Sequence, residues 1–146
     1  MRHFARAERG SALVELALAL PMLILVLVGI VEFGRAVNAY VTISGAAREG
    51  ARYAVLHPSG PPEDITAEVR ARVVPLDSGA VSVTASYYDG TTFQPWPPTG
   101  IPFANPPRYI PARVAVSYPW SAASFIGSFF AQSVSFGASS TMDALR

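Results

Sequence analysis

The chain has 146 residues, of which 51% are hydrophobic, and a formal net charge of +1 at pH 7. This length allows one membrane helix and one small domain, and the near-neutral charge argues against a nucleic-acid or acidic partner. There is no cysteine and there are only two histidines, His3 and His57, which excludes thiol catalysis and cysteine-based metal sites. Without a phosphate-binding glycine loop or a nucleophile elbow, we expect neither an enzyme nor a cofactor.

The first element is an apolar segment of membrane length. Residues 11–31 are mostly Leu, Ile, Val and Ala, and Glu15 is their one charged residue. The apolar side chains favour insertion by about 3 to 7 kcal/mol, against a cost of at most about 3 kcal/mol for a carboxylate. We therefore expect this segment to cross a membrane. A carboxylate inside such a segment is rare and usually functional, which makes Glu15 the first candidate site residue.

The charges around this segment predict its orientation. Residues 1–10 hold three arginines against one glutamate, and the next basic residue after the segment is Arg35. The positive-inside rule then places the N-terminus in the cytoplasm and the rest of the chain outside it. A cleaved secretory signal peptide is the alternative. It is disfavoured because the apolar run is long and leads into Glu32-Phe-Gly-Arg35 instead of a small-x-small cleavage site.

Helical spacing continues beyond the apolar segment as far as Leu56, where Pro58 supplies a stop. A helix from Ser11 to Leu56 would be about 69 Å long, with a kink expected at Pro21. In its second half, helical spacing places one stripe of residues on a single face: Ala36, Tyr40, Ile43, Ala47, Ala51 and Ala54. The same half is rich in small residues that favour close packing, namely Gly45, Ala46, Ala47, Gly50, Ala51 and Ala54. An alanine-rich composition explains these small residues equally well.

The remaining residues predict a small α+β domain. A short helix is expected from Pro61 to Val73, closed by Pro75. Alternating apolar residues then predict three strands, at 81–87, 114–118 and 134–138, and the pattern of the third can be continued to Met142. We expect the fold class to be α+β, with a long N-terminal transmembrane helix packed on a small antiparallel β-sheet.

Two segments of this domain have no regular pattern. Residues 95–111 hold seven prolines, which predicts an extended surface loop whose aromatic side chains pack back on the domain. Residues 121–130 are rich in Phe and predict a short apolar helix. From these patterns we expect three parts of the chain. Residues 1–10 form a cytoplasmic leader, residues 11–57 form a long helix that is transmembrane in its first half, and residues 58–146 form an extracytoplasmic α+β domain that carries the proline-rich loop.

Three motifs together resemble the TadE-like family, pilin-like proteins of bacterial tight-adherence (Flp pilus) systems. They are Gly10-Ser11-Ala-Leu-Val-Glu15 before the apolar run, Glu32-Phe-Gly-Arg35 after it, and Ala46-Ala-Arg48-Glu49-Gly50-Ala-Arg52. The resemblance covers about the first 56 residues. It implies a class III leader that prepilin peptidase cuts between Gly10 and Ser11, so that Glu15 becomes the fifth residue of the mature protein.

In that family context, the amine of a neighbouring subunit would neutralise Glu15 and fix the register of the two helices. The structural alternative for Glu15 is a first-turn acid that interacts with the helix dipole. Surface ion pairing would likewise explain the motif residues Arg48, Glu49 and Arg52. The chain departs from the major Flp pilins, which are far shorter and have tyrosine where this chain has Leu16.

The resemblance implies a minor pseudopilin of the bacterial inner membrane that acts in assembly of a Flp-type pilus or secretion apparatus. Its partners would be other pilins and pseudopilins, the inner-membrane assembly platform and prepilin peptidase, with no small-molecule substrate. The alternative is a single-pass anchored extracytoplasmic sensor or binding module with a pocket under the proline-rich loop. A tethered hydrolase is disfavoured because acids such as Asp77 and Asp89 have no recognisable catalytic partners.

Overall fold

The computed structural model describes residues 4–101, 110–123 and 133–143, with side chains from Ser11 onward. These residues fall into two compact units, one formed by residues 4–35 and 121–123 and the other by residues 36–101, 110–120 and 133–143. We call the second unit the sheet domain. Residues 102–109 of the predicted proline-rich loop and residues 124–130 of the predicted helix at 121–130 lie outside the described residues.

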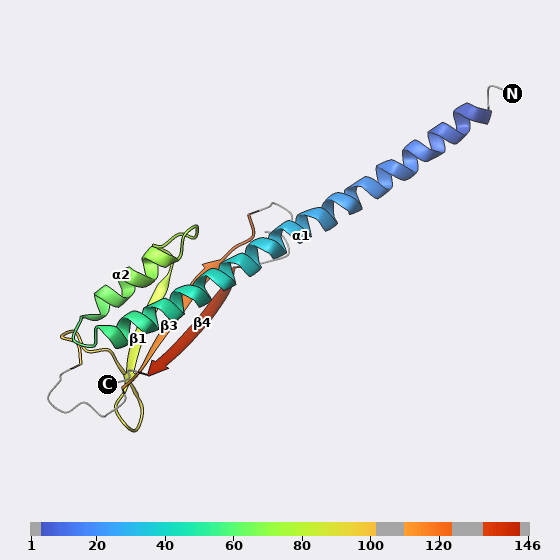
Figure 1. Ribbon diagram of the computed structural model, residues 1–146. Coiled ribbons are helices and arrows are strands. Elements are labelled where there is room, and N and C mark those ends of the chain that lie inside the picture. Colours follow the sequence, from blue (N-terminus) through green and yellow to red (C-terminus); the bar gives the residue numbers. More distant parts are fainter. Residues whose placement is uncertain (1–3, 102–109, 124–132, 144–146) are drawn as a thin grey trace. The chain divides into compact units, whose positions relative to one another are not determined.

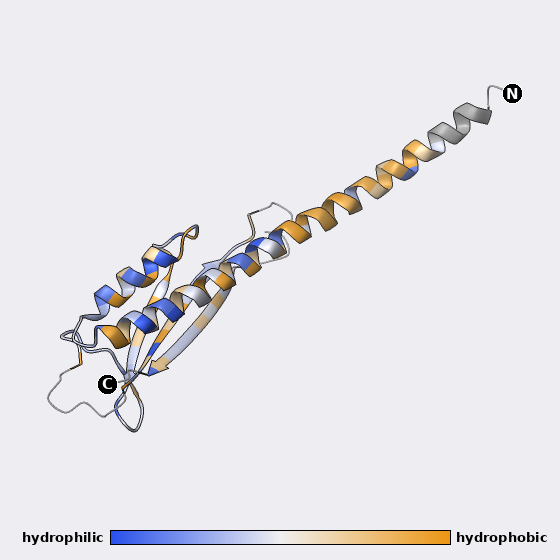
Figure 2. Ribbon diagram, in the orientation of Figure 1, coloured by the Kyte–Doolittle hydropathy of each residue, from blue (hydrophilic) through white to orange (hydrophobic). Residues whose placement is uncertain are grey.

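Helix α1 (Phe4–Leu56) is continuous and includes Pro21. Its last residue confirms the predicted stop before Pro58, whereas its first residue lies within the predicted leader. Between Ser11 and Val31 its side chains are almost all exposed and apolar, and Figure 2 shows this part as the most hydrophobic stretch of the helix. Among the described residues, the helix from Ser11 to Leu56 is long and apolar enough to cross a membrane.

The sheet domain holds one short helix and four strands. They are α2 (Pro62–Arg72), β1 (Ser82–Tyr88), β2 (Phe93–Pro95), β3 (Pro111–Trp120) and β4 (Val134–Asp143). The strands form an antiparallel sheet in the order β2-β1-β3-β4 (Figure 1). This confirms the α+β fold class, with a long N-terminal helix on a small antiparallel sheet. The three predicted strands are present, and β4 includes Met142.

Strand β2 was not predicted. Because of it, the two end residues of the predicted proline-rich loop belong to strands. Pro95 is the last residue of β2 and Pro111 is the first residue of β3, so the loop between strands is shorter than predicted. Proline is tolerated at these positions because they lie at an edge strand and at a strand start. The turn before β2 is fixed by Asp89, whose carboxylate accepts hydrogen bonds from Thr92, Thr91 and Gln94. These bonds hold the pKa of Asp89 well below its usual range, the backbone N–H of Thr92 contributing most.

The hydrophobic core lies between one face of the sheet and the two helices, which lie side by side over it in Figure 1. Helix α2 contributes Ile65 and Val69, and the central strand β3 contributes Ala112, Val114 and Val116. The predicted stripe on α1 is confirmed at Ile43, Ala47, Ala51 and Ala54, which are all buried. The first two residues of the stripe are less buried than the rest: Ala36 is half-buried, and Tyr40 is 51% exposed.

The first part of the proline-rich loop packs back on the domain, as predicted. Trp96 is buried, and its indole N–H donates a 3.0 Å hydrogen bond to the carbonyl oxygen of Gly60. Gly100 has a φ of +73°, and a Cβ there would lie 2.3 Å from the backbone of Ser59. A larger residue at this position would therefore push the loop away from the segment that precedes α2.

Candidate processing and assembly site

The predicted processing point and the predicted assembly residue both lie on α1. Gly10 and Ser11 are consecutive helical residues, and Glu15 follows Ser11 by about one helical turn. The side chains of Ser11 and Glu15 are exposed, and the neighbours of Glu15 are apolar and also exposed, Leu13, Val14 and Leu16 among them. Within the part of the chain that the structure describes, Glu15 forms no ion pair. Its carboxylate therefore lies on an apolar helix surface without a described counter-charge.

The second motif forms an ion pair one turn apart on α1. The guanidinium of Arg35 lies 2.7 Å from the Glu32 carboxylate, in an i, i+3 arrangement. The Glu32 side chain is only 13% exposed, whereas that of Arg35 is 46% exposed. A paired acid and base at the end of an apolar run cost less free energy to place near a membrane than either charge alone. This geometry is compatible with the end of a membrane span.

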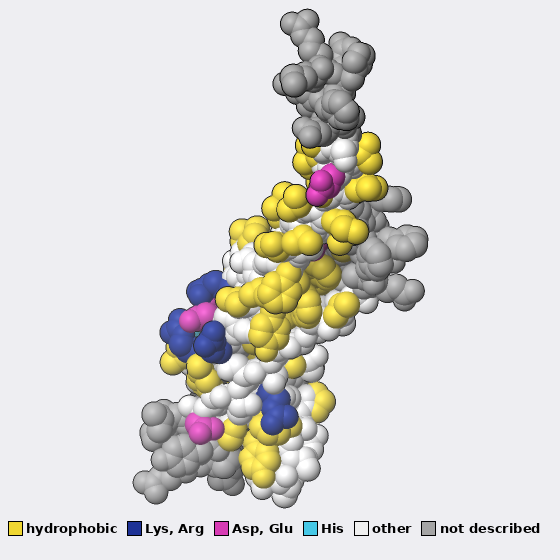
Figure 3. Space-filling model, turned by 90° about the vertical axis from the view of Figure 1, so that its right-hand side faces the viewer, with side chains coloured by type: hydrophobic (Ala, Val, Ile, Leu, Met, Phe, Trp, Pro, Cys, Tyr) yellow, Lys and Arg dark blue, Asp and Glu magenta, His cyan; other side chains and the backbone are white. Residues whose placement is uncertain are grey.

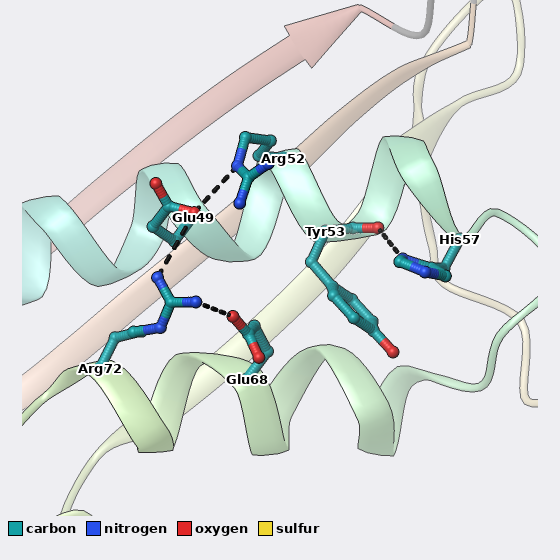
Figure 4. A network of polar contacts seen from close by, with 6 residues as sticks. All are labelled: Glu49, Arg52, Tyr53, His57, Glu68 and Arg72. Atoms are coloured by element: carbon teal, nitrogen blue, oxygen red, sulfur yellow. Dashed lines mark hydrogen bonds and ion pairs between the residues drawn. The ribbon is translucent and has the colours of Figure 1, made fainter.

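The third motif connects α1 to α2 through a chain of charges (Figure 4). The Nε of Arg52 donates a 2.9 Å hydrogen bond to the Glu49 carboxylate, and Arg72 of α2 lies 3.5 Å from the same carboxylate. Arg72 also pairs with Glu68 at 2.6 Å. The Arg52 hydrogen bond lowers the pKa of Glu49, and the nearby charges of Arg52 and Arg72 act in the same direction. Because these groups are solvent-exposed, their ion pairs contribute little to the free energy of unfolding.

Gly50 of the same motif has a packing role. A Cβ at this position would lie 2.5 Å from Cγ2 of Val69 in α2 and 3.2 Å from Cγ1 of Val114 in β3. Real side chains do not approach this closely, so only glycine allows α1 to meet α2 and β3 together at this point. The contrast is Gly45, also in α1, where an added Cβ would meet nothing within 4 Å.

Sequence reasoning missed Glu68, Val69 and Arg72 as partners of this motif. The spacing of Glu68 and Arg72 indicates an i, i+4 pair, but the sequence holds no signal that brings them to Glu49. The remaining motif residue, Arg48, is exposed and borders an open groove that also includes Gly45 and Arg72. Nothing in the structure explains why arginine is needed there.

The geometry of His57 indicates a structural role. Its ring stacks on that of Tyr53 at a centroid distance of 4.2 Å, and its Nδ1 lies 3.2 Å from the Tyr53 carbonyl oxygen. The imidazole thereby covers the C-terminal end of α1. Among the described residues, no group of three or more histidine, cysteine, aspartate or glutamate side chains is placed to hold a metal ion. The site as a whole offers helix surface and paired charges, which suit protein contacts.

A helix of membrane length with an exposed apolar surface, continued into a small α+β domain, fits a membrane-anchored protein. Comparison with known families gives a more specific class. Residues 10–52 match the family model described as TadE-like protein. The match confirms the resemblance inferred from the three motifs and includes all three. No curated protein and no solved structure shows significant similarity to the chain.

Proposed function

We propose that this chain is a minor pseudopilin that acts in the assembly of a Flp-type, tight-adherence pilus or of a related secretion apparatus. The observation that carries the proposal is the placement of Gly10, Ser11 and Glu15 on one continuous helix, within the segment that matches TadE-like proteins. Proteins of that family function in pilus systems and are generally not enzymes. The sheet domain makes each subunit bulky, which suits a rare component better than a thin, densely packed fibre.

In this proposal each part of the chain has a separate task. Residues 1–10 are a cytoplasmic leader that prepilin peptidase removes, which would change the formal net charge from +1 to −1. Residues 11–57 anchor the protein in the inner membrane through their first half and support the sheet domain with their second half. Residues 58–146 complete that domain outside the cytoplasm, where other pilins and pseudopilins contact it. The assembly platform contacts the membrane helix.

The proposed topology gives a direct test of anchoring. A phosphatase that is active only outside the cytoplasm, fused after Arg146, is expected to be active, because three leader arginines retain the N-terminus inside. The same enzyme fused to Met1 is the matched control and should be inactive. A stable C-terminal fusion without phosphatase activity would contradict both the topology and the pseudopilin proposal.

The role in assembly is tested by gene deletion. In the native host, a strain without this chain is expected to lose its Flp-type pili, counted by electron microscopy of whole cells. A plasmid copy of the wild-type chain should restore them. Normal numbers of pili in the deletion strain would show that the chain has no part in assembly, and would leave the anchored sensor or binding module as the alternative.

A further inference from the structure

The bond that the proposed processing would cut lies within α1 and not before it. Helix α1 begins at Phe4, so residues 4–10, about two turns, precede the Gly10–Ser11 bond (Figure 1). By the helical pattern of backbone hydrogen bonds, the N–H of Val14 donates to the carbonyl oxygen of Gly10. Proteases act on a locally opened chain, because an intact helix keeps its peptide bonds away from their active sites. Residues 4–10 must therefore unwind before this bond is cut.

The sequence stabilises these first two turns of α1 poorly. The residue before the helix, His3, is not one of the residues that cap helix starts, and the first turn contains no acid. Arg6 and Arg9 bring positive charge to the positive end of the helix dipole, where only Glu8 has the favourable sign. Gly10 lowers the population of the helical form about fivefold relative to alanine. The local sequence therefore favours unwinding of residues 4–10.

Ser11 offers a better start for the same helix. Serine is among the strongest capping residues, and in a helix that starts there its hydroxyl can accept the N–H of Leu13 or Val14. The side chains that follow are almost all apolar and exposed, and the upper part of Figure 3 shows them as a mainly hydrophobic surface. In the proposed membrane this part stays helical, because lipid cannot satisfy free backbone groups. Unwinding of α1 from its start would therefore stop at Ser11.

We propose that prepilin peptidase cuts a minor form of the chain in which residues 4–10 are unwound and the helix begins at Ser11. The inference rests on the proposed processing and adds the conformation in which the chain is cut. Ser11 is then a positioning residue, because its hydroxyl caps the shorter helix and so places the Gly10–Ser11 bond directly before it. Hydrolysis adds water across that bond and leaves a carboxylate on Gly10 and an amine on Ser11.

The first test changes the capping residue. Full-length chains in detergent are mixed with membranes that contain the host's prepilin peptidase, and intact-mass analysis follows the release of residues 1–10 at low chain concentration. When opening is fast, the rate of cleavage follows the population of the opened form. Ser11→Ala should reduce this rate about fivefold. Ser11→Asn and Ser11→Asp cap a helix as well as serine does, so both should be cut at the wild-type rate although they differ in size and charge.

The second test changes the helix on either side of Ser11. Ala7→Gly weakens only the longer helix, so it should raise the rate of cleavage about fivefold. Ala17→Gly makes the same chemical change at a position that is helical in both forms. It should leave the rate of cleavage unchanged, which makes it the matched control.

Amide-resolved hydrogen exchange of the same chains without peptidase measures the opening itself. Amides of residues 8–14 lose their helical hydrogen bonds when residues 4–10 unwind. They should therefore exchange together, and faster than the amides from Glu15 onward. Ala7→Gly should speed this exchange, and Ser11→Ala should slow it.

The possible outcomes separate this inference from the proposed function. If the wild-type chain is cut and both Ser11→Ala and Ala7→Gly are cut at the same rate, the inference is overturned but the pseudopilin proposal stands. Slow cleavage of Ser11→Asn and Ser11→Asp would show that the peptidase recognises serine itself, which contradicts the capping role. Equal protection of residues 8–14 and 15–20 would show that residues 4–10 do not open separately, which also overturns the inference. A wild-type chain that is never cut would contradict the pseudopilin proposal and the inference with it.

Discussion

Glu15→Val is expected to reduce pilus number to that of the deletion strain while the chain still inserts in the membrane. Removal of the carboxylate lowers the free energy of insertion by up to about 3 kcal/mol, so the amount of protein in the membrane should not fall. Assembly should fail because a neighbouring subunit's N-terminal amine would lose its counter-charge. A buried charge without its partner costs about 3 to 5 kcal/mol.

Two further variants test whether loss of the negative charge of Glu15 causes the assembly defect. Glu15→Gln retains the size and polarity of the side chain but not its charge, and it should fail like Glu15→Val. Leu16→Val changes the adjacent apolar residue and should assemble normally, because Leu16 is exposed and apolar in the structure. The measurements are pilus counts and immunoblots of membrane fractions. If Glu15→Val supports normal assembly, the carboxylate has no part in assembly. The alternative interaction with the helix dipole would then apply only to a cleaved chain whose helix begins at Ser11, because α1 of the full chain begins at Phe4.

Gly50→Ala is expected to destabilise the sheet domain by about 1 to 3 kcal/mol through overpacking, although alanine is the better helix former. The added methyl group would lie 2.5 Å from Cγ2 of Val69, which is fully buried. Gly45→Ala makes the same chemical change in the same helix at an open position. It should be neutral or stabilise the domain by up to about 1 kcal/mol.

Denaturant unfolding of the full-length chains in detergent measures this difference. Tryptophan fluorescence reports on unfolding of the sheet domain, since both tryptophans, Trp96 and Trp120, are buried in that domain. Val69→Ala should reduce the penalty of Gly50→Ala, so the double variant should be more stable than the sum of the single effects predicts. A Gly50→Ala chain at least as stable as Gly45→Ala would contradict the close packing of α1, α2 and β3.

The sequence predicted the elements that have a strong local signal. The apolar run and the stop at Pro58 located α1, and period-two alternation located β1, β3 and β4. Strand β2 was missed because it has three residues and ends in Pro95, so its pairing depends on the Asp89 turn and on the neighbouring β1. Tyr40 was placed on the buried stripe because helical periodicity cannot show where the sheet domain stops covering α1.

The candidate site was predictable as a set of positions but not as a set of contacts. Motif spacing identified Glu49, Gly50 and Arg52, whereas the partners of these residues come from α2 and β3. Long-range pairs of this kind have no signature in a single sequence. The roles that we propose for Gly10 and Glu15 involve a peptidase and a neighbouring subunit, which lie outside any one chain.

Intact-mass analysis of the protein extracted from membranes of its native host tests the central claim most directly. The pseudopilin account predicts a chain that begins at Ser11, because prepilin peptidase cuts after Gly10 and leaves the apolar helix on the mature protein. Gly10→Leu should block this cut and yield a membrane-inserted chain that retains residues 1–10, since the apolar segment is unchanged. A wild-type chain that retains residues 1–10 in cells with active prepilin peptidase would contradict the account.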